Sequence, residues 1–220
     1  MGSIPIPGTT NTNGLLRQYF PKGKEERVRL SLPAPQPLLT PITMKYCSSC
    51  GQPVSRQVPE GDTHKRWVCD SCKRIHYQNP LIVVGCVPER DGKILLCKRA
   101  IEPRYGCWTV PAGFMELSES TAQGAARETL EEACAEVEIG HLFALVDVVD
   151  AGQVHLFYTA KLLGDFDAGN ESLEVALFGE DEVPWDNIAF QSGRYALQKY
   201  FEDKGEDNGL HIHELRRSRS

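Results

Sequence analysis

The spacing of apolar residues predicts one clear helix in the middle of the chain. Between residues 121 and 133, small and apolar side chains return at helical intervals, at Ala122, Ala125, Leu130 and Ala133. Ser120, followed three positions later by Gln123, has the form of a capping box, in which each side chain bonds the other residue's backbone N–H. The pattern therefore predicts a helix over about 121–133.

The segments around this helix have the pattern of β-strands. Residues 81–87 and 93–99 predict two strands joined by a turn at Asp91-Gly92, and residues 142–149 and 154–162 predict a second pair around residues 150–152. A further strand is expected over 174–178, followed by a helix over about 193–201 that Ser192 would cap. Helices and strands in this order predict an α/β protein.

The turn at Asp91-Gly92 would place Cys86 opposite Cys97 on neighbouring strands. The same register pairs Pro88, which lacks an N–H, so we expect a slipped register or a bulge there. Cys86, Cys97 and Cys107 are interpreted as packing residues, because free cysteine is commonly buried. No other role for these residues, or for Cys134, follows from the sequence.

The central helix carries acidic residues in an unusual arrangement. Glu128, Glu131 and Glu132 are spaced i, i+3 and i+4, so their carboxylates share one face of the helix and repel each other. Divalent cations among the oxygens would remove the repulsion, and an all-oxygen site suits Mg²⁺ or Mn²⁺. Arg127 would contact Glu131 and reach back to Glu119. A solvated acidic helix face is the alternative interpretation.

The full spacing resembles the Nudix box, the signature of hydrolases that cleave nucleoside diphosphates linked to another moiety. The positions that carry the resemblance are Gly113, Glu119, Arg127, Glu128, Glu131 and Glu132. The chain departs from the box at Thr129, where an aliphatic residue is usual, and at Cys134-Ala135, where a glycine and an aliphatic residue are usual. Because a cysteine enters the left-handed conformation less easily than glycine, the helix is expected to end differently.

The resemblance implies a Nudix α/β/α sandwich with a mixed sheet, and it implies roles for individual residues. Glu128, Glu131, Glu132 and the backbone carbonyl of Ala112 would bind Mg²⁺ or Mn²⁺, with Arg127 orienting the glutamates. The base would be Glu128 or a carboxylate later in the chain. That later carboxylate could instead be a further metal ligand, and Glu174 is preferred to Glu171 as the candidate.

Three residues are expected to bind substrate. They are Arg99, at the end of a strand, together with Gly113 and Glu119. A guanidinium at Arg99 suits a phosphate, although a strand-end arginine can also be merely solvated. Gly113 is expected to let the backbone turn tightly ahead of the helix.

Four of the eight cysteines have the spacing of a metal site. Cys47 and Cys50 form one CxxC pair, and Cys69 and Cys72 form a second pair eighteen residues later. Four thiolates complete the tetrahedral coordination of Zn²⁺, so the site is predicted to be structural, within a hairpin made by residues 54–58 and 65–69. A redox CxxC is the competing interpretation.

Composition and charge complete the domain assignment. The 220 residues carry a net charge of −6, and residues 1–45 hold six basic and two acidic side chains, so the rest of the chain is acidic. This argues against a nucleic-acid partner, although zinc ribbons often bind nucleic acid, and no apolar run is long enough to span a membrane. We expect a disordered or transit-derived segment (1–43), a zinc ribbon (44–79), a Nudix domain (80–203) and a flexible tail (204–220).

A Nudix box preceded by a four-cysteine ribbon resembles two groups of enzymes. One is the NADH pyrophosphatases, whose Ser-Gln-Pro-Trp-Pro-Phe-Pro segment is missing from residues 181–190. The other contains ADP-ribose hydrolases and the chloroplast FAD pyrophosphatases of plants, which the chain resembles across about residues 44–203. This resemblance implies FAD as substrate, with ADP-ribose or NADH as alternatives, and a chloroplast rather than cytoplasmic location.

Two further questions stay open at this stage. A homodimer is compatible with the sequence. The competing class of function is a non-catalytic Nudix or zinc-ribbon binding module, for which degraded box glutamates or a basic body would be expected; the box glutamates are intact and the body is acidic.

Overall fold

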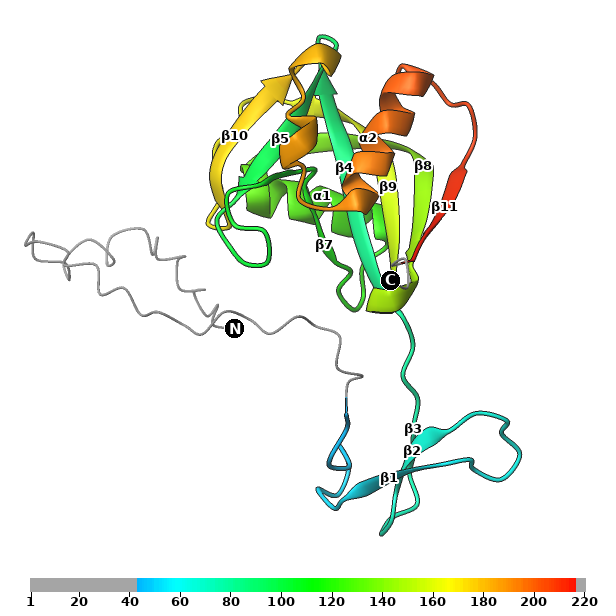
Figure 1. The fold of residues 1–220 in the computed structure, drawn as a ribbon. Helices are drawn as coiled ribbons and strands as arrows, with labels where there is room; N and C mark the ends of the chain where they lie inside the picture. The colour runs from blue at the N-terminus through cyan, green and yellow to red at the C-terminus, as the bar shows by residue number, and fades with distance from the viewer. Residues whose placement is uncertain (1–42, 217–220) are drawn as a thin grey trace, which may run out of the picture. The chain divides into compact units, whose positions relative to one another are not determined.

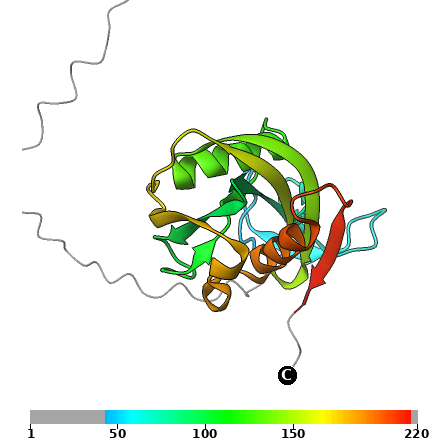
Figure 2. The ribbon, with the colours of Figure 1, turned by 90° about the horizontal axis from the view of Figure 1, so that it is seen from above.

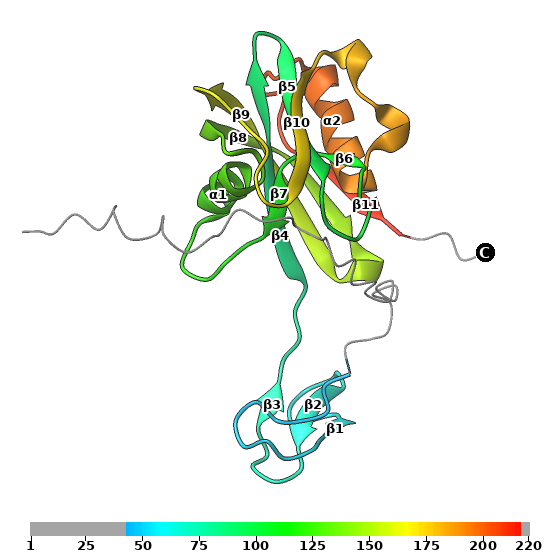
Figure 3. The same ribbon diagram turned by 90° about the vertical axis from the view of Figure 1, so that its left-hand side faces the viewer.

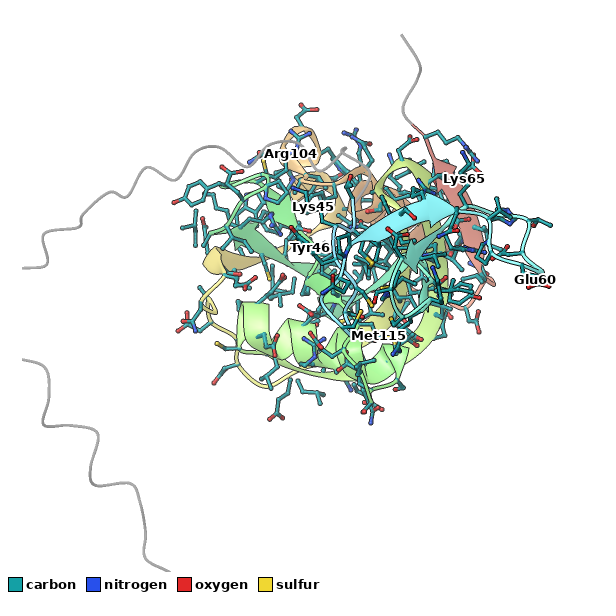
Figure 4. All side chains as sticks on the ribbon, turned by 90° about the horizontal axis from the view of Figure 1, so that it is seen from below. Lys45, Tyr46, Glu60, Lys65, Arg104 and Met115 are labelled. Carbon is teal, nitrogen blue, oxygen red and sulfur yellow. The ribbon has the colours of Figure 1, made fainter. Side chains whose placement is uncertain are left out.

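The computed structural model describes residues 43–216. The segment expected to be disordered or transit-derived therefore falls outside the described residues, apart from Thr43. The first described part is a small three-stranded antiparallel sheet, formed by β1 (Val54–Gln57), β2 (Arg66–Cys69) and β3 (Ile75–His76). β1 and β2 form the predicted hairpin, and Glu60 lies in the loop that joins them (Figure 4).

The second part is built on an eight-stranded mixed sheet (Figure 1). Six strands form the order β10-β5-β4-β9-β8-β11, with β6 paired to β5 and β7 paired to β4. Their bounds are β4 (Leu81–Arg90), β5 (Lys93–Arg99), β6 (Trp108–Thr109), β7 (Ala112–Phe114), β8 (Glu136–Val148), β9 (Gln153–Leu163), β10 (Ser172–Phe178) and β11 (His211–Leu215).

Two helices cover opposite faces of this sheet (Figures 2 and 3). α1 (Thr121–Ala133) packs through Ala125 against Val84 and Cys86 of β4. α2 (Gln191–Asp203) packs through Ala196, Leu197 and Tyr200 on the other face, in a core that includes Val87 of β4. β4 is buried on both faces, which explains its unbroken apolar run. The layers confirm the α/β/α sandwich with a mixed sheet.

The turn at Asp91-Gly92 forms as predicted, with both residues in the left-handed region at φ 53° and 75°. The expected slippage at Pro88 does not occur. The antiparallel ladder between β4 and β5 comprises only Glu89 with Ile94 and Arg90 with Lys93, so it ends before the proline. β4 also pairs in parallel with β9 from Leu81 to Glu89, and residues 83–85 pair with β7. Cys86 and Cys97 are free thiols.

α1 has the predicted bounds, and its capping box is formed. The Gln123 N–H donates to the Ser120 hydroxyl oxygen at 3.2 Å, and the Ser120 N–H donates to the Gln123 side chain at 2.8 Å. The expectation about the end of the helix was wrong. Cys134 does take the left-handed C-cap conformation, at φ 48° and ψ 30°, although it carries a side chain.

The strained cap at Cys134 predicts that Cys134→Gly stabilises the protein by about 0.5–1 kcal/mol, because glycine enters the left-handed region without the steric cost of a Cβ. The thiol is exposed, so little packing is lost. Urea or thermal unfolding should show the gain, whereas Cys134→Ser, which keeps the Cβ, should leave stability unchanged. Equal effects of both variants would attribute the change to the thiol instead.

Two features near the C-terminus differ from expectation. α2 begins at Gln191 with Phe190 as its N-cap, so Ser192 is a buried residue of the first turn and not the cap. β11 lies within the segment expected to be a flexible tail, where it pairs in parallel with β8 from His211 opposite Ala144 to Leu215 opposite Val148. Three short 3-10 helices complete the described chain: η1 (Val149–Ala151), η2 (Glu180–Glu182) and η3 (Trp185–Asn187).

None of the helices formed by residues 43–216 combines the length and apolar character needed to cross a membrane.

Candidate active site

Arg127 is the centre of an ion-pair network on α1. Its Nε and Nη2 donate to both carboxylate oxygens of Glu119 at 3.0 and 2.9 Å, and Nη2 also donates to the Phe114 carbonyl at 3.1 Å. Nη1 donates to Glu128 at 2.7 Å and to Glu131 at 3.0 Å. These contacts confirm the predicted reach of Arg127 to Glu119 and Glu131. They hold the loop before α1, strand β7 and the acidic helix face together.

The carboxylate of Glu128 lies against the backbone of Gly113. A Cβ at residue 113 would lie 2.3 Å from a Glu128 oxygen, closer than atoms can approach. Gly113 belongs to strand β7 and its φ is not positive, so the turn expected there is not the reason for glycine. The reason is the close approach of the carboxylate. Burial raises the pKa of Glu128, and Arg127 opposes this effect.

Glu132 is the most deeply buried of the three helix glutamates, with 7% of its surface exposed, against 59% of the Glu131 side chain. Its Oε2 is buried and has no hydrogen-bond partner among the described residues. Burial raises the pKa of this carboxyl to about 8, and the charge of Glu128 adds to the rise, whereas Arg99 and the backbone of Ala112 oppose it. The fold thus holds a buried carboxyl with one oxygen that has no partner among the described residues.

The donor set fits a hard divalent cation. A cation would satisfy the unpartnered oxygen of Glu132 and would offset the repulsion between Glu132 and Glu128. Arg127 forms ion pairs with both Glu128 and Glu131, at 2.7 and 3.0 Å. Ala112, on β7, lies beside Glu132 of α1, so its backbone carbonyl is available as a further ligand for the cation.

The later carboxylate that faces this cluster is Glu171 and not Glu174. The charge of Glu171 raises the pKa of both Glu128 and Glu132. Glu174 instead pairs with Lys98 at 3.2 Å and is half exposed. The cause is an irregularity in β10, which shifts its register against β5 between Ser172 and Glu174. The position of Glu174 therefore speaks against the sequence-based preference, and Glu171 is the better candidate.

Arg99 ends β5 close to these acidic groups. Its Nε donates to the Pro103 carbonyl at 2.9 Å, and its guanidinium carbon lies 5.0 Å from the ring centre of Phe190. Within residues 43–216 its terminal Nη groups have no protein acceptor. Its charge lowers the pKa of Glu132, so the guanidinium lies near enough to act on that carboxyl. The arrangement favours anion binding over a merely solvated arginine.

The four predicted zinc ligands meet in one cluster. The sulfur atoms of Cys47, Cys50, Cys69 and Cys72 all lie within 4.8 Å of one another, and no other group of three or more acidic, histidine or cysteine ligands in the described chain is so close. Separations of 3.4 Å, 3.5 Å and 3.7 Å approach the ~3.8 Å edge of a tetrahedron with metal–sulfur bonds of about 2.3 Å. The cluster fits zinc.

Backbone and histidine donors surround this cluster. The N–H groups of Ser49 and Cys72 donate to the sulfurs of Cys47 and Cys69, each at 3.4 Å. The Nε2 of His76 lies 3.3 Å from the Cys47 sulfur, and the residue is half-buried. His64 is exposed. Such hydrogen bonds orient metal ligands and stabilise their thiolate form.

The buried carboxylates on α1 form a site that suits a divalent cation, which is the arrangement expected of a metal-dependent hydrolase. Comparison with known proteins gives the family. The NUDIX domain family model matches residues 79–198, and the Nudix N-terminal model, which describes the zinc ribbon, matches residues 45–78. The chain belongs to the Nudix family of hydrolases.

Individual relatives support the same assignment. A crystal structure of a NUDIX hydrolase from Nitrosomonas europaea is 51% identical, with a TM-score of 0.76, and the match covers 79% of this chain and all of that one. The ADP-ribose pyrophosphatase of Methanocaldococcus jannaschii is 29% identical over 49% of this chain and 67% of its own length. The NAD-capped RNA hydrolase NudC of Salmonella heidelberg is 36% identical over 40% of this chain, and the match spans only 32% of the relative.

Some residues of the site were not found from the sequence. Glu171 was considered but ranked second, because the irregularity in β10 has no local signal. Phe190 was missed. No signal in the sequence pointed to it, because the helix was expected to begin after Ser192, whereas the structure makes Phe190 the N-cap.

Proposed function

We propose that this enzyme hydrolyses the diphosphate of an adenosine-containing dinucleotide, and that FAD, cleaved to FMN and AMP, is its preferred substrate. The observation that carries the proposal is the buried, unpartnered oxygen of Glu132 beside the carboxylate of Glu128, which is a site built for a divalent cation. ADP-ribose and NADH are the alternative substrates. The names of the ADP-ribose pyrophosphatase and NudC relatives favour substrates of this diphosphate class.

Each site residue has a role in this reaction. Glu128, Glu131, Glu132 and the Ala112 carbonyl would hold Mg²⁺ or Mn²⁺, which when bound would neutralise the diphosphate and lower the pKa of bound water. Arg127 positions Glu128 and Glu131 through its ion pairs. The guanidinium of Arg99 binds and orients a phosphate of the substrate.

The chemical step transfers one phosphoryl group to water. The water oxygen forms a bond to one phosphorus of the diphosphate, and the bond between that phosphorus and the bridging oxygen breaks. Glu171 or Glu128 accepts the proton of the water, and the bridging oxygen leaves with the other phosphate. From FAD the products are FMN and AMP.

The preference for FAD rests on the resemblance of residues 44–203 to the FAD pyrophosphatases. We propose a chloroplast location on the same basis. The NADH-type segment is missing from residues 181–190, where the sequence forms η2 and η3 instead. The adenosine and diphosphate parts of the substrate are common to all three candidates.

The proposal is tested by incubating the protein with Mg²⁺ and, separately, FAD, ADP-ribose and NADH, while AMP release is followed. We expect FMN and AMP from FAD at the highest kcat/KM, and a loss of at least about 100-fold in Glu131→Gln, which removes a metal ligand. The exposed Glu136→Gln serves as the matched control.

Higher kcat/KM with ADP-ribose or NADH would overturn the flavin preference and leave the diphosphate chemistry in place. The absence of hydrolysis with every one of the three substrates would overturn the proposed function.

A further inference from the structure

Phe190 occupies a position that helix capping does not explain. It is the N-cap of α2, with extended backbone dihedrals of φ −130° and ψ 138°, and it makes no side-chain capping bond. N-cap positions favour Ser, Thr, Asp and Asn because their side chains satisfy the free N–H groups of the first turn. A phenylalanine gives up that bond, so its ring is expected to serve another purpose.

The ring of Phe190 contacts the guanidinium of Arg99. The guanidinium carbon lies 5.0 Å from the ring centre, within the range of a cation–π contact. Backbone contacts fix both partners. The Ala189 N–H donates to the Trp108 carbonyl at 2.8 Å, and the Arg99 N–H donates to the Cys107 carbonyl at 2.9 Å. Trp108 lies on β6, which pairs with β5 next to Arg99.

These contacts leave the Nη groups of Arg99 free to donate hydrogen bonds to an anion. The guanidinium carbon lies over the Phe190 ring, and the Pro103 carbonyl accepts from Nε. The Nη groups have no acceptor among the described residues. The Ala100 N–H donates to the Glu171 carbonyl at 2.7 Å, so the strand end that bears Arg99 is also tied to the loop that bears Glu171. Such an arrangement limits the rotamers of a long side chain without using its anion-binding edge.

We propose that Phe190 is a positioning residue, which holds the guanidinium of Arg99 ready for the diphosphate of the substrate. The inference rests on the proposed function, since it assigns Arg99 to the diphosphate. It requires that Phe190 affects substrate affinity only by positioning Arg99, and that the affected contacts are those to the phosphates. Contact between the ring and the substrate's base would be a different role.

Two non-hydrolysable ligands separate these roles. Imidodiphosphate contains the diphosphate alone, and α,β-methylene-ADP adds an adenosine. Titration calorimetry with Mg²⁺ present should show that Phe190→Leu weakens both ligands by the same factor, about 3- to 10-fold. Phe190→Tyr, which keeps the ring, should bind both ligands as tightly as the unmodified protein. Phe201→Leu on the same helix should also leave the affinities unchanged.

A double-mutant cycle tests the route through Arg99. In an Arg99→Met background, Phe190→Leu should have no further effect on the Kd of imidodiphosphate. An equal loss with and without Arg99, or a loss confined to the adenosine-containing ligand, would overturn the inference.

The same readouts separate this inference from the proposed function. Because both ligands are inert, the result does not depend on which dinucleotide is hydrolysed. An unmodified protein that binds both ligands, with no change in Phe190→Leu, overturns the role of Phe190 alone. An unmodified protein that binds neither overturns both proposals.

Discussion

Glu132→Gln should lose about 1,000-fold in kcat/KM while making the metal-free protein more stable. Glutamine keeps the volume of the buried side chain but cannot carry the negative charge that holds a divalent cation, and a loss of about 4 kcal/mol in transition-state stabilisation corresponds to that factor. Assays with the preferred dinucleotide at saturating Mg²⁺ give the activity. Calorimetric titration with Mg²⁺ gives the metal affinity, which should fall in parallel.

The stability change has a defined sign and pH dependence. Burial raises the pKa of Glu132 from its ordinary value of 4.5 to about 8 in the metal-free fold. A carboxyl with a raised folded pKa binds more protons in the folded state, so stability falls as the pH rises from about 4.5 to about 8. Glutamine removes this loss, so the metal-free variant should be more stable than the unmodified protein at pH 9, with little difference at pH 4.5.

Unfolding of both proteins in EDTA at the two pH values is the measurement. A variant that is inactive and less stable at pH 9 would mean that Glu132 holds the fold together, contrary to its unpartnered position. Glu136→Gln, on the exposed start of β8, should change neither activity nor stability.

Local signals in the sequence predicted the parts of the structure that local chemistry determines. The Ser120 capping box gave the correct start of α1, because both of its hydrogen bonds close within one turn. The turn at Asp91-Gly92 forms at the predicted place, since its conformation depends on those two residues. The cysteine spacing predicted a cluster whose four members lie in and around one small hairpin.

Features that depend on distant partners could not be predicted in the same way. β11 has weak apolar alternation, and it forms a strand because the edge of β8, more than sixty residues earlier in the chain, offers free backbone groups. β6 and β7 contain two and three residues, too few for a periodic pattern. The choice between Glu171 and Glu174 depends on one extra residue in β10, which alters the register without a mark in the sequence.

The zinc ribbon should lose its structure when one cysteine is removed. We expect Cys69→Ser to reduce bound zinc from one ion per chain to below about 0.1, because serine is a poor ligand for a site made of thiolates. Amide hydrogen exchange in β1, β2 and β3 should become at least about 100-fold faster, whereas exchange in β8 and β9 should stay slow. Metal analysis and exchange mass spectrometry of the full chain give both readouts.

The reason lies in how little else holds this module together. Its buried apolar side chains within residues 43–80 are Cys47, Val68 and Cys69, so two of the three belong to the cluster itself. A segment of this size cannot offset the entropy of folding by burial alone, whereas structural zinc contributes on the order of 10 kcal/mol. Cys107→Ser, which changes a half-buried thiol outside the cluster, should keep the zinc. Slow exchange in zinc-free Cys69→Ser would show that side-chain packing suffices, and loss of protection in the unmodified protein on treatment with a reductant would favour a redox pair over a metal site.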